Sequence, residues 1–89
     1  MFTEKLRFED SHDDFLREEL KNWRLEQSRI ELVPAYLVFS NKVLDSLVKF
    51  RPMNKISLRS ISGIGSMKIN KYGEEIIDII SRSTPEISS

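Results

Sequence analysis

Hydrophobic positions recur at helical spacing in the first third of the chain. The segment from residue 11 to residue 30 carries one apolar stripe at spacings of three, four and seven. The members of this stripe are Leu16, Leu20, Trp23 and Ile30, with Gln27 between them. Ser11, Asp13 or Asp14 can cap the helix, and its acidic first turn suits the helix dipole. We therefore predict a first helix here, with Trp23 in the core.

The pattern changes after residue 30. Val33 precedes Pro34 and should be extended. The following apolar run, residues 35–39, has the composition of a strand, but the chain offers no second strand to pair with it. We interpret it as an ordered loop through the core, which ends at Ser40 or Asn41 as the cap of a helix over 41–50. This helix carries on one face Val43, Leu44, Leu47 and Val48, and Pro52 prevents its continuation.

The last third is predicted to form three short helices. Asn54 can cap a helix over 55–61, with apolar Ile56, Leu58 and Ile61. A glycine corner at 63–65 leads into a helix over 66–72, for which Gly73 is the expected left-handed end. A final helix over 74–81 should bury Ile76, Ile77 and Ile80. The prediction is an all-α fold, a compact bundle of about five short helices with a Gly-Ile-Gly corner like that of helix-hairpin-helix modules.

The two ends of the chain lack this periodicity. We expect residues 1–11 to be a flexible lead-in, residues 12–82 to form the helical domain and residues 83–89 to be a disordered tail. The chain of 89 residues is one small domain, and it has no cysteine, so disulfides and thiolate metal sites are excluded. No apolar run could span a membrane, and the charged N-terminus does not resemble a secretory signal.

The formal net charge of zero conceals an uneven distribution of charge. Residues 1–33 hold six basic and nine acidic residues, a net charge of −3, whereas residues 41–72 hold seven basic residues and one acid, a net charge of +6. A surface of one sign attracts polyanions whatever the total charge. The alternative is that the acidic first helix packs near the basic half and neutralises it.

The sequence contains no catalytic arrangement of side chains. The adjacent acids Asp13-Asp14 and Glu74-Glu75 stand at predicted helix starts, where the helix dipole accounts for them. We therefore expect neither catalysis nor a cofactor or metal. The basic segment favours nucleic acid, because neutralisation of phosphates by Lys and Arg releases counterions. The start of the helix after the corner, at Gly65 and Ser66, can present free amides to a phosphate.

Two dense motifs resemble a known family. They are VPAYLVFSN at 33–41 and GIGSMKINKYG at 63–73, preceded by L-x-x-W-R at 20–24 and separated by R-P at 51–52. This order, over residues 13–82, resembles the HRDC domain, the helicase and RNase D C-terminal module. In two places the chain departs from the family pattern: Ser28 stands where alanine is frequent, and Leu32 where a glycine or polar residue is frequent.

The resemblance implies a non-catalytic accessory domain of an ATP-dependent DNA helicase of the RecQ type, or of a UvrD-like helicase or an RNase D exonuclease. Such enzymes serve DNA repair and recombination, in the cytoplasm and nucleoid of bacteria or in the nucleus. Several members bind single-stranded or partly duplex DNA weakly, and others contact proteins instead. The tyrosine that matches Tyr36 is implicated in DNA contact in RecQ members.

The expected partners are DNA, held weakly and in a salt-sensitive way, and the helicase core of the parent chain, with the domain itself a monomer. The DNA-contacting residues that we expect are Tyr36, Lys42, Lys49, Arg51, Lys55, Arg59, Gly65, Ser66, Lys68 and Lys71. The alternative to DNA contact by Tyr36 is a half-buried ring that seals the loop onto the core. The alternative for the lysines is an ordinary solvated face. For the domain, the alternative is a protein-interaction or regulatory module that uses the acidic first helix. Ion pairs from the basic residues to Glu18, Glu19 or Glu26 would favour it.

Overall fold

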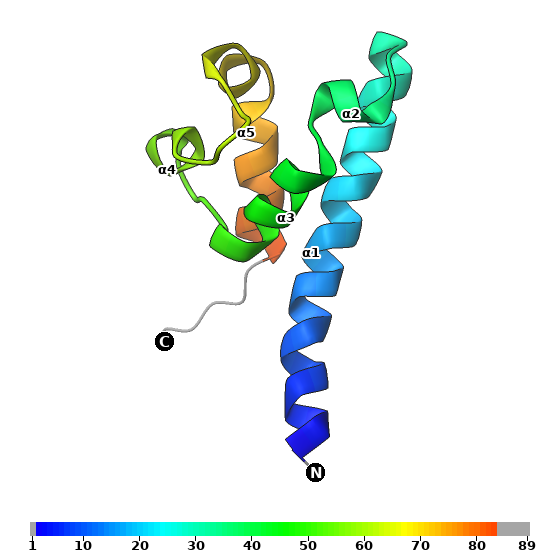
Figure 1. Cartoon of the computed structure of the whole chain (residues 1–89), viewed down its shortest axis with the longest axis vertical. Helices are drawn as coiled ribbons and strands as arrows, with labels where there is room; N and C mark the ends of the chain where they lie inside the picture. Colours follow the sequence, from blue (N-terminus) through cyan, green and yellow to red (C-terminus); the bar gives the residue numbers. More distant parts are fainter. Residues whose placement is uncertain (1, 84–89) are drawn as a thin grey trace.

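The computed structural model describes the backbone of residues 2–83 and the side chains of residues 12–83. The described backbone forms five α-helices and no strand (Figure 1). They are α1 (Phe2–Glu31), α2 (Ala35–Val38), α3 (Asn41–Phe50), α4 (Lys55–Arg59) and α5 (Ser66–Ser83). Helices α2, α3 and α5 pack against α1, while α4 packs on α5 and lies on the side of α5 away from α1 (Figure 1). The predicted all-α fold is confirmed.

Helix α1 begins at Phe2, earlier than the start predicted near residue 11. Residues 2–11 contain no glycine or proline and several strong helix formers, so the helix extends towards the N-terminus even without an apolar stripe. The flexibility expected for this segment stays a prediction. The tail was expected over residues 83–89, but Ser83 is the last residue of α5, and residues 84–89 lie outside the described residues.

The predicted stripe of α1 is correct at one end and wrong at the other. Leu16 and Leu20 are completely buried, and Trp23 packs against the core. Ile30 is 68% exposed. Successive residues of a helix differ by about 100° in direction, and the last turn of α1 directs Glu31 and Ser28 inward, so Ile30 faces solvent.

The segment predicted as a loop contains the short helix α2. Pro34, with φ −62°, precedes this helix, and its carbonyl accepts from the Leu37 amide at 3.0 Å. A segment with no partner strand must satisfy its backbone groups locally, and one helical turn does so. The helix and the residue after it bury Val38 and Phe39 in the core.

Helix α3 agrees with the prediction in its bounds and in its buried face. Ser40 is its cap, because the Ser40 side chain accepts from the Val43 amide at 3.2 Å. Its end is closed by Arg51 in the left-handed conformation, φ 45°. Helix α4 is shorter than predicted and begins at the Asn54 cap. Of the apolar residues of this predicted helix, Leu58 and Ile61 are buried and Ile56 is 83% exposed.

The two helices predicted over 66–72 and 74–81 form the single helix α5, and Gly73 lies inside it. The prediction that Gly73 ends a helix is therefore wrong. Gly73 is buried, and a Cβ there would lie 3.4 Å from Ile69 Cγ2 and 3.6 Å from Leu58 Cδ2. These are ordinary van der Waals distances, so the position does not require glycine, and the burial of α5 residues on both sides of Gly73 outweighs the cost of glycine in a helix.

The glycine corner between α4 and α5 depends on Gly63. This residue has φ +97°, and a Cβ there would lie 2.8 Å from Val43 Cγ2 of α3. Gly65 has no neighbouring atom within 4 Å of such a Cβ. Across the part of the chain that the structure describes, no helix has the length and apolar character needed to cross a membrane.

Candidate nucleic-acid interface

Three of the seven basic residues of the 41–72 segment are held by carboxylates. Arg51 Nη2 lies 3.0 Å from Asp13 Oδ1, Lys55 Nζ lies 3.8 Å from Glu74 Oε2, and Lys71 Nζ lies 3.1 Å from Glu31 Oε1. The single acid of the segment, Asp45, is itself paired with Arg17 of α1. The local excess of positive charge is therefore smaller than the sequence count indicates.

The contacts of Arg51 connect parts of the fold. Its side chain is only 19% exposed, and besides Asp13 it reaches the carbonyl of Ser83 at 3.5 Å. It thereby joins the end of α3 to α1 and to the last residue of α5. These contacts do not favour the DNA contact predicted for Arg51. Lys55, by contrast, is paired with the highly exposed Glu74 at long range, an interaction that contributes little.

The other four basic residues form no ion pair with any residue between 12 and 83. They are Lys42, Lys49, Arg59 and Lys68. Lys42 and Lys49 are seven residues apart on α3, two turns of one face, and Lys49 Nζ lies 5.3 Å from the centre of the Phe50 ring. Lys42 adjoins Val43, which touches the glycine corner.

Tyr36 lies on α2 with 66% of its surface exposed. The alternative of a half-buried ring sealing the segment onto the core is therefore wrong. An exposed ring of this kind can stack with a base, although stacking remains a prediction. Gly65 and Ser66, both exposed, stand at the start of α5, as expected for the predicted phosphate contact.

Lys68 and Lys71 meet α2 at a hollow of about 300 Å³. This hollow, called the α2–α5 hollow below, is lined by Glu31, Val33, Leu37, Met67, Lys68, Lys71 and Tyr72. Leu37 is the neighbour of Tyr36 along the chain, so the structure brings two of the predicted lysines to the helix that carries the predicted tyrosine. The remaining basic residues do not line this hollow.

Glu31 anchors one wall of the hollow. Its carboxylate accepts hydrogen bonds from the Tyr72 hydroxyl at 2.6 Å, from Lys71 Nζ at 3.1 Å and from Gln27 Nε2 at 3.2 Å. The bond from Tyr72, with those from Gln27 and Lys71, lowers the pKa of Glu31. Burial, and then the bond to Glu31, raises the pKa of Tyr72 to about 12. Glu31 and Lys71 thus form an ionised pair with little net charge.

Sequence reasoning did not identify Glu31 as part of the site. One signal was available: the acid stands in the last turn of α1, where the helix dipole disfavours negative charge. Tyr72 is 3% exposed and is therefore a core residue. Trp23 stacks on Phe39 with ring centroids 6.2 Å apart and meets Tyr72 edge-on at 5.3 Å, so the aromatic cluster supports the wall beside Glu31.

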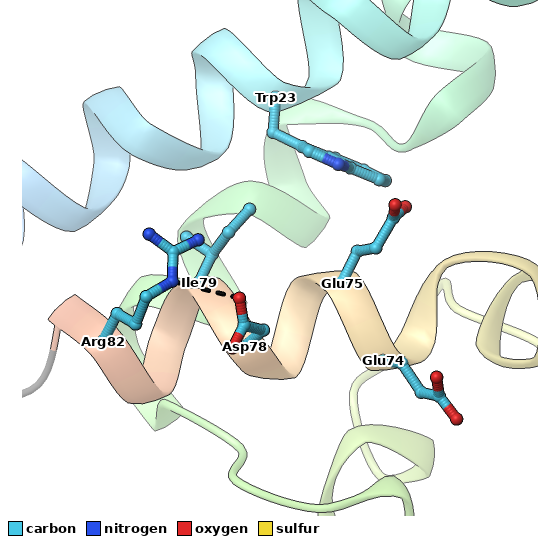
Figure 2. A pocket seen from close by; sticks show the side chains of 6 residues that line it. All are labelled: Trp23, Glu74, Glu75, Asp78, Ile79 and Arg82. Atoms are coloured by element: carbon cyan, nitrogen blue, oxygen red, sulfur yellow. Dashed lines mark hydrogen bonds and ion pairs between the residues drawn. The ribbon is translucent and has the colours of Figure 1, made fainter.

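A second hollow, of about 360 Å³, lies between α1 and α5 and has the opposite charge (Figure 2). It is lined by Trp23, Glu74, Glu75, Asp78, Ile79 and Arg82. Figure 2 shows the carboxylate of Glu75 directed towards the Trp23 indole, and Arg82 paired with Asp78 at 3.0 Å. Three carboxylates and one guanidinium give this hollow a net negative charge, which disfavours phosphates.

The residues between 12 and 83 include no group of histidines and acids that could hold a metal ion. The geometry of the described side chains therefore offers cations, an exposed tyrosine and an apolar hollow, which are the elements of a binding surface.

Comparison with known proteins agrees with the resemblance of the motifs. The family model described as the HRDC domain matches residues 14–80. The ATP-dependent DNA helicase UvrD2 of Mycobacterium tuberculosis is 33% identical over 72 residues, which is 81% of this chain and 10% of that protein. The ATP-dependent DNA helicase RecQ of Bacillus subtilis is 36% identical over 63 residues, which is 71% of this chain and 11% of that protein.

A solved structure, HRDC domain 3 of Deinococcus radiodurans RecQ, superposes with a TM-score of 0.77 and 32% identity, covering 80% of this chain and 93% of that one. The chain spans about a tenth of the length of these two curated helicases. The match over most of the helical region and the shared fold lead to one conclusion: this chain belongs to the HRDC domain family, with relatives in helicases of the RecQ and UvrD types.

Proposed function

We propose that the chain is a non-catalytic accessory domain that tethers a DNA helicase to single-stranded or branched DNA. The observation that carries the proposal is the 66% exposed Tyr36 on α2, next to the hollow that Lys68 and Lys71 line. Stacking on an aromatic ring holds unpaired bases without regard to sequence, and lysine holds the phosphates.

The distribution of charge indicates which part of the surface a DNA strand would follow. Lys42 and Lys68 have no ion-pair partner among residues 12–83 and stand near the starts of α3 and α5. The acidic hollow at Trp23 lies further along α5, at residues 74–82, and its net negative charge repels phosphate. We infer that the strand passes over α2 and the glycine corner rather than along the groove between α1 and the middle of α5.

A tether of this kind needs only weak affinity. When the domain is joined to a helicase core that also holds DNA, its binding becomes intramolecular, and the effective concentration amplifies a small free energy. The proposal accordingly places the domain as a monomer within a larger ATP-dependent helicase, in the compartment that contains the DNA, with repair or recombination as the process.

The test is a fluorescence-anisotropy titration of the 89-residue chain with labelled single-stranded oligonucleotides at about 50 mM and 200 mM salt. Saturable binding that weakens with salt is the expected result. Lys68→Ala should weaken binding and reduce the slope of log K against log salt by about 0.7. Tyr36→Ala should weaken it about tenfold with little change in slope.

The matched control is Lys21→Ala. Lys21 lies on α1, where its nearest acid is Glu18 at 3.9 Å, so its removal changes the net charge equally without touching the proposed surface. An equal loss of affinity in Lys21→Ala and Lys68→Ala would show that only net charge matters and would overturn the assigned surface.

The competing function is a protein-interaction or regulatory module on the acidic face of α1. This function would be favoured if the basic residues of the 41–72 segment were paired with Glu18, Glu19 or Glu26. Their observed partners are instead Asp13, Glu31 and Glu74. The condition is therefore not met among the described residues. Absence of DNA binding even at low salt would favour this second function.

A further inference from the structure

The α2–α5 hollow has a wall that DNA binding does not require. Met67 is 83% exposed and Leu37 is 51% exposed, and both line the hollow together with Val33. Leu32, 88% exposed, immediately precedes Val33. Single exposed apolar residues are ordinary on protein surfaces, but apolar side chains gathered around one concavity indicate a binding site for another apolar group.

The chemistry of this wall distinguishes between possible occupants. Its exposed members are aliphatic, and the aromatic ring of Tyr72 is 3% exposed, so a base inside the hollow would find no ring face to stack on. Leucine and methionine are adaptable partners for the apolar side chains of peptides. The interior of the hollow therefore suits a peptide side chain better than a nucleobase.

The net charge of the hollow determines the sign of charge that is favoured beside the apolar group of a bound partner. Glu31 and Lys71 neutralise each other, and the carboxylate is further satisfied by Tyr72. Lys68 lines the hollow with no ion-pair partner among residues 12–83, which leaves a net positive charge. An anionic group beside the apolar one would be attracted, and a basic peptide would be repelled.

We propose that the α2–α5 hollow is a docking site for an acidic peptide segment that inserts one large apolar side chain between Leu37 and Met67 and places a carboxylate on Lys68. The site lies beside the proposed DNA surface and shares Lys68 with it. A bound peptide would therefore compete with single-stranded DNA, but only the peptide would contact the apolar side chains of Leu37 and Met67.

The test begins with selection of binders to the immobilised 89-residue chain from a library of random displayed peptides. The expected consensus is one large apolar residue flanked by aspartate or glutamate. A synthetic, fluorescently labelled copy of the selected peptide is then titrated with the chain and its variants. Failure to enrich any sequence, or enrichment of a consensus without acids or without an apolar residue, would overturn the proposal.

Two pairs of matched variants locate the binding site. Met67→Ser should weaken the selected peptide about tenfold, as expected for loss of one buried apolar side chain, while Ile56→Ser, at an equally exposed position on α4, should not. Lys68→Ala should weaken it in a salt-dependent way, and Lys49→Ala, on α3 away from the hollow, should not. Circular dichroism confirms that each variant is folded.

A DNA titration separates this proposal from the proposed function. Met67→Ser should leave the affinity for single-stranded DNA unchanged, and unlabelled oligonucleotide should displace the labelled peptide. Loss of DNA binding in Met67→Ser, with peptide binding unaffected, would show that the hollow is part of the nucleic-acid surface and would overturn the peptide site. If the chain binds no DNA and the peptide consensus still appears, only the proposed function fails.

Discussion

The phenol of Tyr72 on α5 donates a 2.6 Å hydrogen bond to Oε2 of Glu31, the last residue of α1. The two residues are 41 positions apart in sequence, and their bond joins the end of α1 to the N-terminal half of α5 beside the α2–α5 hollow. It also changes the acid–base behaviour of both groups in opposite directions, which makes the contact measurable.

The first prediction concerns alkaline pH. The pKa of Tyr72 is raised from 10.0 to about 12, so its contribution to stability is complete below pH 10 and is lost as the pH rises towards 12. The free energy of unfolding of the wild-type chain should therefore fall by about 1–3 kcal/mol more than that of Tyr72→Phe over this range. Urea denaturation at pH 9, 10 and 11 measures the difference, and parallel curves for the two proteins would contradict it.

The second prediction concerns acid pH. The pKa of Glu31 lies below its ordinary 4.5, so its contribution to stability is complete above pH 4.5 and is lost as the pH falls through the lowered value. Glu31→Gln should be less stable than the wild type at neutral pH and should lose less stability on acidification. Thermal denaturation between pH 3 and pH 7 tests this, with Glu26→Gln, an exposed position on α1, as the control.

The third prediction separates the two glycines of the corner. Gly63→Ala must place a Cβ at positive φ and 2.8 Å from Val43 Cγ2, which should cost about 2–4 kcal/mol of stability. Gly65→Ala meets no atom within 4 Å and should change stability by less than about 0.5 kcal/mol. Equal effects in chemical denaturation would show that the corner is not built around Gly63.

The fourth prediction uses Leu32, a residue other than glycine that has a positive φ. Leu32 has φ 59°, a left-handed conformation that is costly for a residue with a Cβ, and its side chain is 88% exposed. Leu32→Gly should stabilise the domain by about 0.5–1 kcal/mol, the relief of strain exceeding the added entropy of the unfolded chain. Ile30→Gly, in the last turn of α1, should instead destabilise it by about 0.5–1 kcal/mol.

The fifth prediction distinguishes a structural cation from a binding one. Arg51 is largely buried against Asp13 and Ser83, so Arg51→Ala should lower the melting temperature and leave DNA affinity nearly unchanged for the folded protein. Lys68→Ala should show the reverse, since Lys68 has no ion-pair partner between residues 12 and 83. Thermal denaturation and anisotropy on the same samples compare them, and a large DNA defect in Arg51→Ala would contradict the assignment.

The boundaries of α3 and its four buried residues followed from local pattern, because a cap, an apolar face and a following proline act within a few residues of one another. Gly73 shows where such reasoning fails. A glycine after a tyrosine is typical of a helix end, yet here the helix continues, because residues on both sides of Gly73 are buried in one core, and local rules do not reveal this packing. Likewise, residues 35–38 became helix α2 rather than a loop because the available hydrogen-bond partners were local.

The candidate site, too, was predicted from the sequence only in part. The seven basic residues were correctly recognised as a charged segment, but their pairing with Asp13, Glu31 and Glu74 depends on contacts between helices. Composition predicted a net charge for the segment, and the fold decided which cations remain without a carboxylate.

The sequence alone determined the helical class, the caps of α3 and α4, the glycine corner and the motifs of the HRDC family, since these depend on the order of neighbouring residues. The cap expected at Ser11, Asp13 or Asp14 was wrong, because α1 begins at Phe2. Tertiary structure decided the exposure of Tyr36, the absence of an ion-pair partner for Lys68 among residues 12–83, and the α2–α5 hollow. Each of these depends on which surfaces of α1, α2 and α5 meet. Such meetings bring together residues far apart in the chain, and their free energy comes from the whole packed core rather than from any local pattern.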